Sequence, residues 1–282
     1  MITLVKIGGS VLTDKQRPLF FQDAYAHRVA ADIRMSRTVP VIVHGTGSWA
    51  KAIGRHYYID GGWTRDLTGF QMTALRIRRL QEALAAVLRD EGVVCSPIQA
   101  NAVFHRTDGV LDFYDTEPIR RLVEAGVSPL LCGDVLVEGP SKFRVVSSDA
   151  IAVTVARRMP VSACVFATDV DGVWDPTGRI MPEVTQPDLA VSDSDRRDVT
   201  GGMSAKIAAA LSIARTGART TIVNGRVRGR VRDALAGRSV IGTRVVGRSP
   251  RSEGRGGPGA PGSDRPAAPE LGAPEFSADR VL

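Results

Sequence analysis

Short runs of β-branched and other apolar residues recur along the first 246 positions of the chain, and between them apolar residues return at every third or fourth position. The runs are typical of strands buried on both faces, and the intervening pattern is typical of amphipathic helices. We predict strands at Ile2–Ile7, Val39–Val43, Val93–Ile98, Ser128–Cys132, Arg144–Ser147, Val161–Thr168 and Arg219–Val223, with Val240–Val246 as an edge strand.

The clearest helical pattern lies between Thr68 and Asp90, where apolar side chains form one stripe beside arginines. Further helices are predicted at Phe21–Met35, Glu117–Glu124, Ser148–Arg158 and Met203–Thr216. Because strands and helices alternate, we expect an α/β protein, a three-layer αβα sandwich with a mostly parallel central sheet.

The pattern ends at about Val246. The last 36 residues, 247–282, hold seven glycines and six prolines and show no apolar periodicity. A segment of this composition cannot bury enough apolar surface to offset the entropy lost on ordering its backbone. We therefore expect residues 247–282 to form a disordered tail.

A chain of 282 residues that is 43% hydrophobic and 24% charged can form a sizeable core. No window approaches the roughly 18 consecutive apolar residues of a membrane helix, and the first residues lack the basic start of a signal peptide. The three cysteines, Cys95, Cys132 and Cys164, are too widely spaced for a disulfide framework or a metal motif. We expect a cytoplasmic protein with no membrane partner.

The formal net charge of +7 raises the question of a nucleic-acid partner. The tail carries five arginines and five acidic residues, so the surplus lies before it, where no basic run with interleaved aromatic residues occurs. Arg226, Arg228, Arg230 and Arg232 alternate in one short stretch, but aromatic residues make up only 5% of the chain. We therefore expect no nucleic-acid partner.

Lysine is rare in this chain, since the 37 Lys and Arg residues include only five lysines. Four of the five lie in or beside glycine-rich segments, which suggests sites that need a compact, flexible ammonium group rather than a planar guanidinium fork. The lysines are Lys6, Lys15, Lys51, Lys142 and Lys206.

Turns rich in glycine or aspartate follow several predicted strands, at 6–10, 44–48, 133–134 and 168–172, and another at 198–203 precedes a helix. Ligands of a parallel α/β sheet bind at the carboxyl ends of its strands, and the backbone N–H groups of such turns suit a polyphosphate. Any one of these turns can equally be an ordinary connection. Five together indicate a phosphate-binding edge.

The motifs stand in a fixed order along the chain: Lys6-x-Gly8-Gly9-Ser10, His44-Gly45-x-Gly47-Ser48, Gly133-Asp134, Ser147-Ser148-Asp149, Thr168-Asp169-Val170-Asp171-Gly172 and Asp198-Val199-Thr200-Gly201-Gly202-Met203-x-x-Lys206. This ordered set resembles the amino acid kinase superfamily, and specifically its isopentenyl phosphate kinase branch, to which fosfomycin kinases are related. The resemblance covers all of the chain except the tail. It implies the amino acid kinase fold, with residues 1–160 as the acceptor-binding half and residues 161–246 as the nucleotide-binding half.

The resemblance also implies ATP-dependent phosphoryl transfer, in which the protein mainly positions the reactants and neutralises charge. Lys6 and Lys206 would lie at the transferred phosphoryl group, with Asp149 between the two ammonium groups because like charges repel. Lys15 would be either a further lysine near the γ-phosphate or a solvated loop cation. The residues implied in ATP binding are Gly8, Gly9, Ser10, Gly47, Thr168, Asp169, Asp171, Gly172, Gly201 and Gly202.

The acceptor site implied by the resemblance comprises Gly45, Thr46, Lys51, Gly133 and Ser148. In this branch the second glycine loop reads GGGSFGH, and its histidine binds the phosphate of the acceptor. Here Lys51 stands in the place of that histidine, and Thr46 replaces the middle glycine. A lysine could bind an anionic acceptor as a point charge, whereas the threonine could exclude the usual substrate or bond a more polar one.

The leading hypothesis is a kinase that uses ATP and Mg²⁺ and converts a small monophosphate, most similar to isopentenyl phosphate, into a diphosphate. A second hypothesis, favoured by Thr46 and Lys51, is a kinase of specialised metabolism acting on a phosphonate or another anionic or hydroxylated intermediate. A non-catalytic nucleotide sensor and a carboxylate kinase are further alternatives. Mg²⁺ would sit mainly on the ATP phosphates. The resemblance also implies a homodimer.

Overall fold

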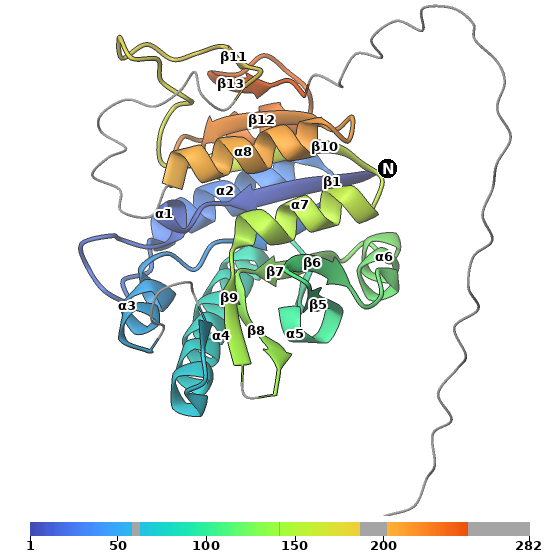
Figure 1. The fold of residues 1–282 in the computed structure, drawn as a ribbon. Coiled ribbons are helices and arrows are strands. Elements are labelled where there is room, and N and C mark those ends of the chain that lie inside the picture. The colour runs from blue at the N-terminus through green and yellow to red at the C-terminus, as the bar shows by residue number, and fades with distance from the viewer. Residues whose placement is uncertain (58–62, 141, 187–201, 248–282) are drawn as a thin grey trace, which may run out of the picture. The chain divides into compact units, whose positions relative to one another are not determined.

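An eight-stranded sheet forms the centre of the computed structural model, which describes residues 1–57, 63–140, 142–186 and 202–247 (Figure 1). The strands lie in the order β11, β13, β12, β10, β1, β2, β7, β4. From β12 to β4 all neighbours pair in parallel, whereas β13 runs antiparallel to β12. The strands are β1 (Ile2–Ile7), β2 (Val41–His44), β4 (Cys95–Pro97), β7 (Ser128–Cys132), β10 (Val161–Thr168), β11 (Glu183–Val184), β12 (Arg219–Asn224) and β13 (Gly242–Val245).

Helices cover both faces of this sheet, as Figure 1 shows for α7 and α8 on one side and α2 on the other. Two small sheets, β3–β9–β8 and β5–β6, lie beside it. The helices are α1 (Gly9–Leu12), α2 (Asp23–Ser36), α3 (Gly47–Tyr57), α4 (Leu67–Asp90), α5 (Ala100–Val103), α6 (Glu117–Glu124), α7 (Ser148–Arg158), α8 (Gly202–Ala214) and α9 (Arg230–Leu235). The small-sheet strands are β3 (Trp63–Thr64), β5 (Phe104–Thr107), β6 (Val110–Phe113), β8 (Asp134–Gly139) and β9 (Lys142–Val146).

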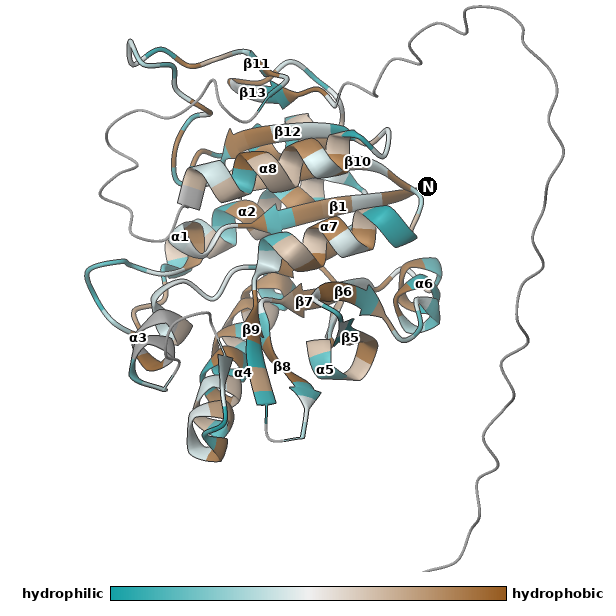
Figure 2. Cartoon of the chain, in the orientation of Figure 1, coloured by the Kyte–Doolittle hydropathy of each residue, from teal (hydrophilic) through white to brown (hydrophobic). Residues whose placement is uncertain are grey.

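Two large hydrophobic clusters form the core, one on each face of the sheet. Residues of β1 alternate between them: Leu4 packs with the cluster of α7 and α8, and Val5 and Ile7 pack with the cluster of α2, α4 and α9. Figure 2 shows the hydrophobic character of the central strands. Because side chains alternate along a strand, Lys6 lies on the same face as Leu4. The alternation therefore places the ammonium group of Lys6 beneath α7 and α8.

The prediction of a three-layer α/β fold with a mostly parallel sheet is confirmed. Ile2–Ile7, Ser128–Cys132, Val161–Thr168, Glu117–Glu124 and Ser148–Arg158 have the predicted bounds. The strand predicted at Val240–Val246 is present as β13, but its predicted place at the edge of the sheet was wrong, because β13 lies between β12 and the two-residue strand β11. A strand of two residues shows no alternation of apolar and polar positions, so β11 was not predicted.

Residues Met1–Ser249 form one compact unit. The two predicted halves share the central sheet, since β1 pairs with β2 on one side and with β10 on the other. Their assignment to acceptor and nucleotide stays a prediction. The predicted tail, 247–282, lies outside the described residues except for Gly247. None of the helices in the described part of the chain is long and apolar enough to cross a membrane.

Candidate active site

Three of the predicted glycine loops, together with a turn at Gly225 that was not predicted, leave the sheet side by side at the carboxyl ends of neighbouring strands. In each case the N–H of the first loop residue donates to a carbonyl of the neighbouring strand and so extends the backbone hydrogen bonds of the sheet by one residue. Gly8 donates to the Ala167 carbonyl, Gly45 to Ile7, Gly133 to His44 and Gly225 to Thr168, at 2.8 to 3.1 Å. Four loops from distant parts of the sequence therefore begin at one level of one edge.

The first glycine loop (residues 8–10) and the second glycine loop (residues 45–48) touch through their backbones. A Cβ atom on Gly9 would lie 2.4 Å from the nitrogen of Gly47, and one on Gly45 would lie 2.6 Å from the nitrogen of Gly9. Gly47 also has a positive φ of 49°, which favours glycine. The glycines are needed because no side chain fits between the loops.

The first glycine loop runs directly into α1, whose first N–H groups have no acceptor within the helix. Such groups, together with the positive end of the helix dipole, favour an anionic ligand. The Ser10 hydroxyl donates to Asp169 Oδ1 at 2.7 Å, which ties this loop to the loop after β10. The predicted ATP-binding residues Gly8, Gly9, Ser10, Thr168 and Asp169 are thus brought together.

Three of the predicted acceptor residues also meet. A Cβ atom on Gly133 would lie 2.9 Å from the nitrogen of Ser148, and one on Gly45 would lie 3.4 Å from its hydroxyl oxygen. Ser148 opens α7, whose N-cap Ser147 accepts a hydrogen bond from the Ala150 N–H. The second glycine loop, the Gly133 turn and the first turn of α7 therefore enclose one small region.

Thr46 is half-buried at the tip of the second glycine loop. Lys51 belongs to α3, but its side chain lies outside the described residues. Gly201 also lies outside the described residues, and Gly202 is the first residue of α8. The roles assigned to these positions stay predictions.

Lys6, Asp149 and Lys206 come from β1, α7 and α8 and meet above the sheet. The Lys6 Nζ lies 2.7 Å from Asp149 Oδ1, and the exposed fraction is 3% for Lys6 and 9% for Lys206. Burial by itself raises the pKa of the Asp149 carboxyl, but the charges of Lys6 and Lys206 outweigh it and hold that pKa below its usual range. Asp149 thus pairs directly with Lys6, and its carboxylate also feels the charge of Lys206.

The buried position of Lys206 changes its pKa. Burial, with the charge of Lys6 adding to it, lowers the pKa of Lys206 to about 8, although Asp149 and Asp169 oppose the shift. Two buried ammonium groups, Lys6 and Lys206, thus lie close enough to act on each other's protonation. An anionic ligand at this edge of the sheet would be attracted by both charges.

Lys15 is exposed in the segment after α1. Its charge nevertheless reaches the site, since it acts on both Lys206 and Asp169. Burial by itself raises the pKa of the Asp169 carboxyl, but the Ser10 hydroxyl, followed by the charges of Lys15 and Arg226, lowers that pKa below its usual range.

Two residues of the loop after β10 have structural partners. Asp171 accepts hydrogen bonds from Asn224 and Arg230, so its carboxylate holds the loop against the end of β12. Gly172 packs against β13, because a Cβ atom there would lie 2.7 Å from the hydroxyl oxygen of Thr243. The sequence grouped both with the ATP-binding residues, and their contacts show how the loop is held in place.

Sequence reasoning missed several residues that hold these loops. Arg226 donates to the Ser10 carbonyl at 2.7 Å and lies over the ring of Tyr25. Thr13 contacts both glycine loops through its hydroxyl group. The alternating arginines after β12 were the one feature of the sequence that drew attention to Arg226. Nothing in the local sequence indicates that Arg226 contacts Ser10 or that Thr13 contacts residue 48.

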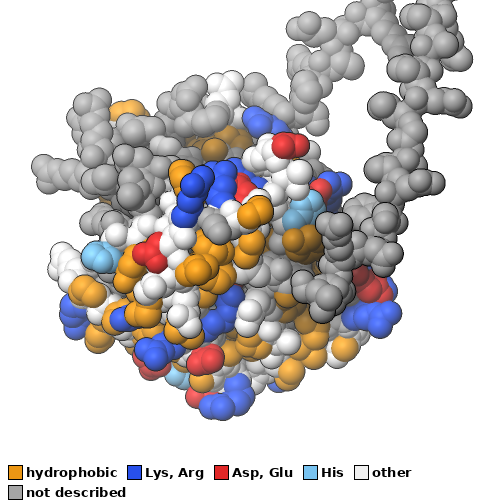
Figure 3. Space-filling model, turned by 60° about the horizontal axis from the view of Figure 1, so that its bottom comes forward, with side chains coloured by type: hydrophobic (Ala, Val, Ile, Leu, Met, Phe, Trp, Pro, Cys, Tyr) orange, Lys and Arg blue, Asp and Glu red, His pale blue; other side chains and the backbone are white. Residues whose placement is uncertain are grey.

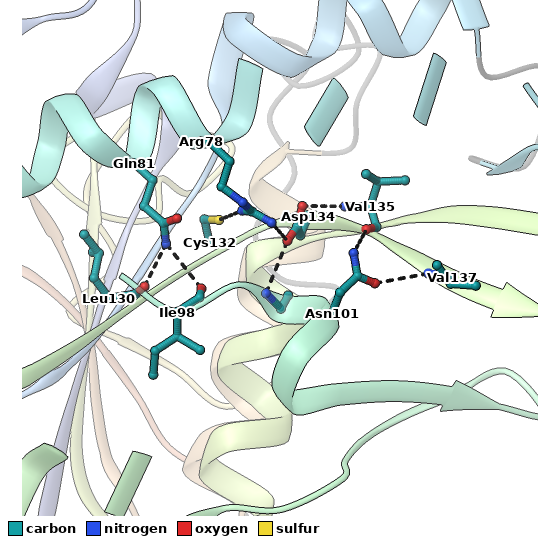
Figure 4. A network of polar contacts seen from close by, with 10 residues as sticks. Arg78, Gln81, Ile98, Asn101, Leu130, Cys132, Asp134, Val135 and Val137 are labelled. Atoms are coloured by element: carbon teal, nitrogen blue, oxygen red, sulfur yellow. Dashed lines mark hydrogen bonds and ion pairs between the residues drawn. The ribbon is translucent and has the colours of Figure 1, made fainter. Parts of the chain in front are cut away.

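A polar network surrounds Asp134, the residue that follows Gly133 (Figure 4). Arg78 of α4 donates to Asp134 Oδ2 at 2.7 Å, and this carboxylate also accepts the N–H groups of Ala100 and Val135. Asn101 of α5 bonds Val135 and Val137, as Figure 4 shows. Because Asp134 is fully buried, burial raises its pKa, and the Arg78 guanidinium opposes that effect.

His44 precedes the second glycine loop and is fully buried. Its Nδ1 lies 3.2 Å from the Gly45 carbonyl, and because a carbonyl only accepts, Nδ1 carries the hydrogen. Burial, with the charge of Arg78 adding to it, lowers the pKa of His44 to about 4. The imidazole is therefore neutral at ordinary pH, and it contacts the backbone of the second glycine loop.

Three apolar residues, Phe70, Ala74 and Ile77, lie on α4. Phe70 stacks on Phe143 of β9 with ring centroids 4.4 Å apart, and Ala74 packs beside them. Ile77 is buried with Ala50 and Cys132 beneath the second glycine loop. On the face drawn in Figure 3, basic side chains are interspersed with hydrophobic and acidic ones.

Comparisons with known proteins agree with this geometry. The model of the amino acid kinase family matches residues 1–224. The chain is 30% identical to the isopentenyl phosphate kinase of Methanothermobacter thermautotrophicus, over 87% of this chain and 99% of that protein. It is 27% identical to the isopentenyl phosphate kinase of Methanocaldococcus jannaschii, over 87% of this chain and 98% of that protein.

A solved structure of an isopentenyl phosphate kinase is similar over the same region. The TM-score is 0.75 at 27% sequence identity, and the match covers 87% of this chain and all of the other. The fold and the sequence therefore point to the same relatives.

Proposed function

Because the chain belongs to the amino acid kinase family, in its isopentenyl phosphate kinase-like branch, we propose that it transfers the γ-phosphoryl group of ATP to a phosphate oxygen of isopentenyl phosphate. The observation that carries the proposal is the pair of buried lysines, Lys6 and Lys206, that share Asp149 at the carboxyl edge of the sheet. Such a site neutralises the negative charge on the phosphoryl group in the transition state of its transfer.

The reaction forms one bond and breaks another. An oxygen of the acceptor's phosphate attacks the γ-phosphorus of ATP, and the bond from that phosphorus to the β–γ bridging oxygen breaks, which leaves ADP and a diphosphate. Lys206 would neutralise charge that develops on the β- and γ-oxygens. Lys6 would lie beside the transferred group, and Lys15 would close on the γ-phosphate. The free N–H groups of the first glycine loop would hold the phosphate chain.

The acceptor would lie between the second glycine loop, Gly133 and Ser148. Their contacts place this region directly beside the first glycine loop. The proposal thus assigns residues 1–160 mainly to the acceptor and residues 161–246 mainly to the nucleotide. The charge of Lys51 would bind the acceptor's existing phosphate in place of an imidazole.

Mg²⁺ is proposed as the ion that accompanies ATP. In the described part of the chain, no group of three or more His, Cys, Asp and Glu side chains could hold a metal ion. Mg²⁺ bound to ATP does not need such a group, since it commonly keeps its waters and binds few side chains. When bound, it would neutralise charge on the phosphate oxygens.

The test is to incubate the protein with ATP, Mg²⁺ and each of isopentenyl phosphate, dimethylallyl phosphate and fosfomycin, and to measure ADP release. We expect turnover of isopentenyl phosphate. Turnover of none of the three would reject the proposed acceptor and leave the family unchanged. The variant Asp149→Asn in the same assay shows whether any ADP release depends on the proposed site.

A phosphonate or another anionic intermediate is the second candidate acceptor, favoured by Thr46 and Lys51. The variant Lys51→His separates the two candidates. If it gains isopentenyl phosphate activity that the parent lacks, the second candidate is supported. If the parent is already efficient, the second candidate is rejected. Light scattering on the purified protein tests the homodimer that the resemblance implies.

A further inference from the structure

Thr13 ends α1 and is 1% exposed. Its backbone is held independently of its hydroxyl group, because its N–H donates to Gly9, its carbonyl accepts from the Gln22 side chain, and it forms a β-bridge with Phe21. The fold therefore does not need the hydroxyl group to keep Thr13 in place. A buried hydroxyl group must still find partners.

The partners of this hydroxyl group come from both glycine loops. Thr13 Oγ1 donates to the Gly9 carbonyl at 2.8 Å and accepts the Ser48 N–H at 3.0 Å. The direction of each bond is fixed, since a carbonyl only accepts and a backbone N–H only donates. A single oxygen atom thus joins the first glycine loop to the second.

The surrounding geometry leaves little room for the loops to slide. A Cβ atom on Gly47 would lie 1.9 Å from Thr13 Oγ1, so the second loop closes directly over the hydroxyl group. Among the described residues, no direct hydrogen bond joins residues 8–10 to residues 45–48. Apart from contact between the glycines and the hydrogen bond from Gly45 to Ile7 at the base of the loops, Thr13 is the polar link between residues 8–10 and 45–48 in the described part of the chain.

We propose that Thr13 is a positioning residue that makes the two glycine loops move as one, so that ATP at the first loop orders the second loop for the acceptor. The inference rests on the proposed function, which assigns ATP to the first loop and the acceptor to the second. Such a link gives positive coupling, because a second ligand meets a loop that the first has already ordered.

The experiment measures backbone amide exchange with and without a non-hydrolysable ATP analogue and Mg²⁺. It compares the parent with Thr13→Val, which keeps the shape and removes the hydroxyl group, and with Thr13→Ser, which keeps the hydroxyl group. Thr154→Val is the matched control, because the Thr154 hydroxyl is also buried and donates to a carbonyl four residues earlier, Ala150, within α7.

In the parent, we expect the analogue to slow exchange at both residues 8–10 and 45–48. In Thr13→Val, protection of 8–10 stays, and protection of 45–48 falls by about tenfold or more. Thr13→Ser and Thr154→Val behave like the parent. In turnover assays, Thr13→Val lowers kcat by about tenfold, because misplaced reactants lose rate even when both still bind.

The outcomes separate the two proposals. If the analogue protects 8–10 and still protects 45–48 in Thr13→Val, the role of Thr13 is wrong. It is equally wrong if Thr154→Val or Thr13→Ser loses as much protection as Thr13→Val. If the analogue leaves 8–10 unprotected in the parent, the assignment of ATP in the proposed function fails first. Should Thr13→Val not fold, Thr13→Ala takes its place in the same comparison.

Discussion

Lys206 shows how position alone changes the chemistry of a side chain. The same ammonium group on an exposed helix would stay charged well above neutral pH, but on α8 it is buried and faces Lys6, and its pKa falls to about 8. The folded protein binds this proton less tightly than the unfolded chain does. Below pH 8 Lys206 is protonated in both states, and its buried charge lowers the free energy of unfolding. Folding stability therefore rises, as far as this group is concerned, when pH increases through and above that value.

Activity should move in the opposite direction. A neutral Lys206 cannot attract phosphate oxygens, so we expect kcat/KM for ATP to fall with a slope of about one as pH rises above 8. In Lys206→Arg the guanidinium group stays charged, so activity is lower throughout but lacks this alkaline decline. The test is to measure kcat/KM for ATP of the parent and of Lys206→Arg between about pH 6 and 10. A parent whose kcat/KM stays flat to the end of that range would contradict the role of Lys206.

Asp149 gives the second prediction at this scale. Asp149→Asn removes the carboxylate that the two buried lysines share, so we expect it to lower the free energy of unfolding by about 3 kcal/mol. Asp90→Asn, which removes an exposed pair with Arg89, should cost less than about 0.5 kcal/mol. Urea unfolding of both variants tests this. Equal losses would show that Asp149 does not balance buried charge.

At the scale of elements, the loops between strands and helices carry the site, and the two glycine loops pack backbone to backbone. Gly9→Ala would place a methyl group 2.4 Å from the nitrogen of Gly47. The loops would have to separate, and we expect kcat/KM to fall by about a hundredfold, since a shift of about 1 Å has effects of that size.

The control is Gly139→Ala in β8, where an added Cβ atom meets nothing within 4 Å. We expect its kcat/KM to equal that of the parent. Steady-state kinetics of the two variants, with circular dichroism to check folding, gives the comparison. If Gly9→Ala retains full activity, the contact between the loops is not needed for catalysis.

The regular elements could be predicted wherever they are long and periodic. β1, β7, β10, α6 and α7 have the predicted bounds. The helices α1, α3, α5 and α9 and the strands β3, β5, β6, β8 and β11 were not predicted. A helix of four residues spans about one turn, so it has no periodicity to read, and its formation depends on tertiary contacts.

For the whole molecule, the boundary of the folded unit can be tested by truncation. Met1–Ser249 form one compact unit, and Gly247 packs against the backbone of Arg215. We expect removal of residues 250–282 to leave the Tm and kcat unchanged. Removal of 245–282 also deletes the buried Val245 and its pairing with Thr220, and should cost about 2 kcal/mol or more.

Thermal unfolding of the two truncated proteins beside the full chain makes this comparison. A lower Tm after removal of 250–282 would mean that the folded unit extends beyond Ser249. An unchanged Tm after removal of 245–282 would mean that β13 adds little to the fold.

The sequence by itself determined the alternation of strands and helices, the turns at the strand ends and the rare lysines among them, because each of these is a local pattern of residue types. The tertiary structure alone decided that Arg226 reaches Ser10, that Thr13 joins Ser48 to Gly9, and that Lys206 loses affinity for its proton. These contacts join residues far apart along the chain, and a pKa depends on burial and on neighbouring charges. Neither distance nor burial is written in a local pattern; both arise only when the chain packs.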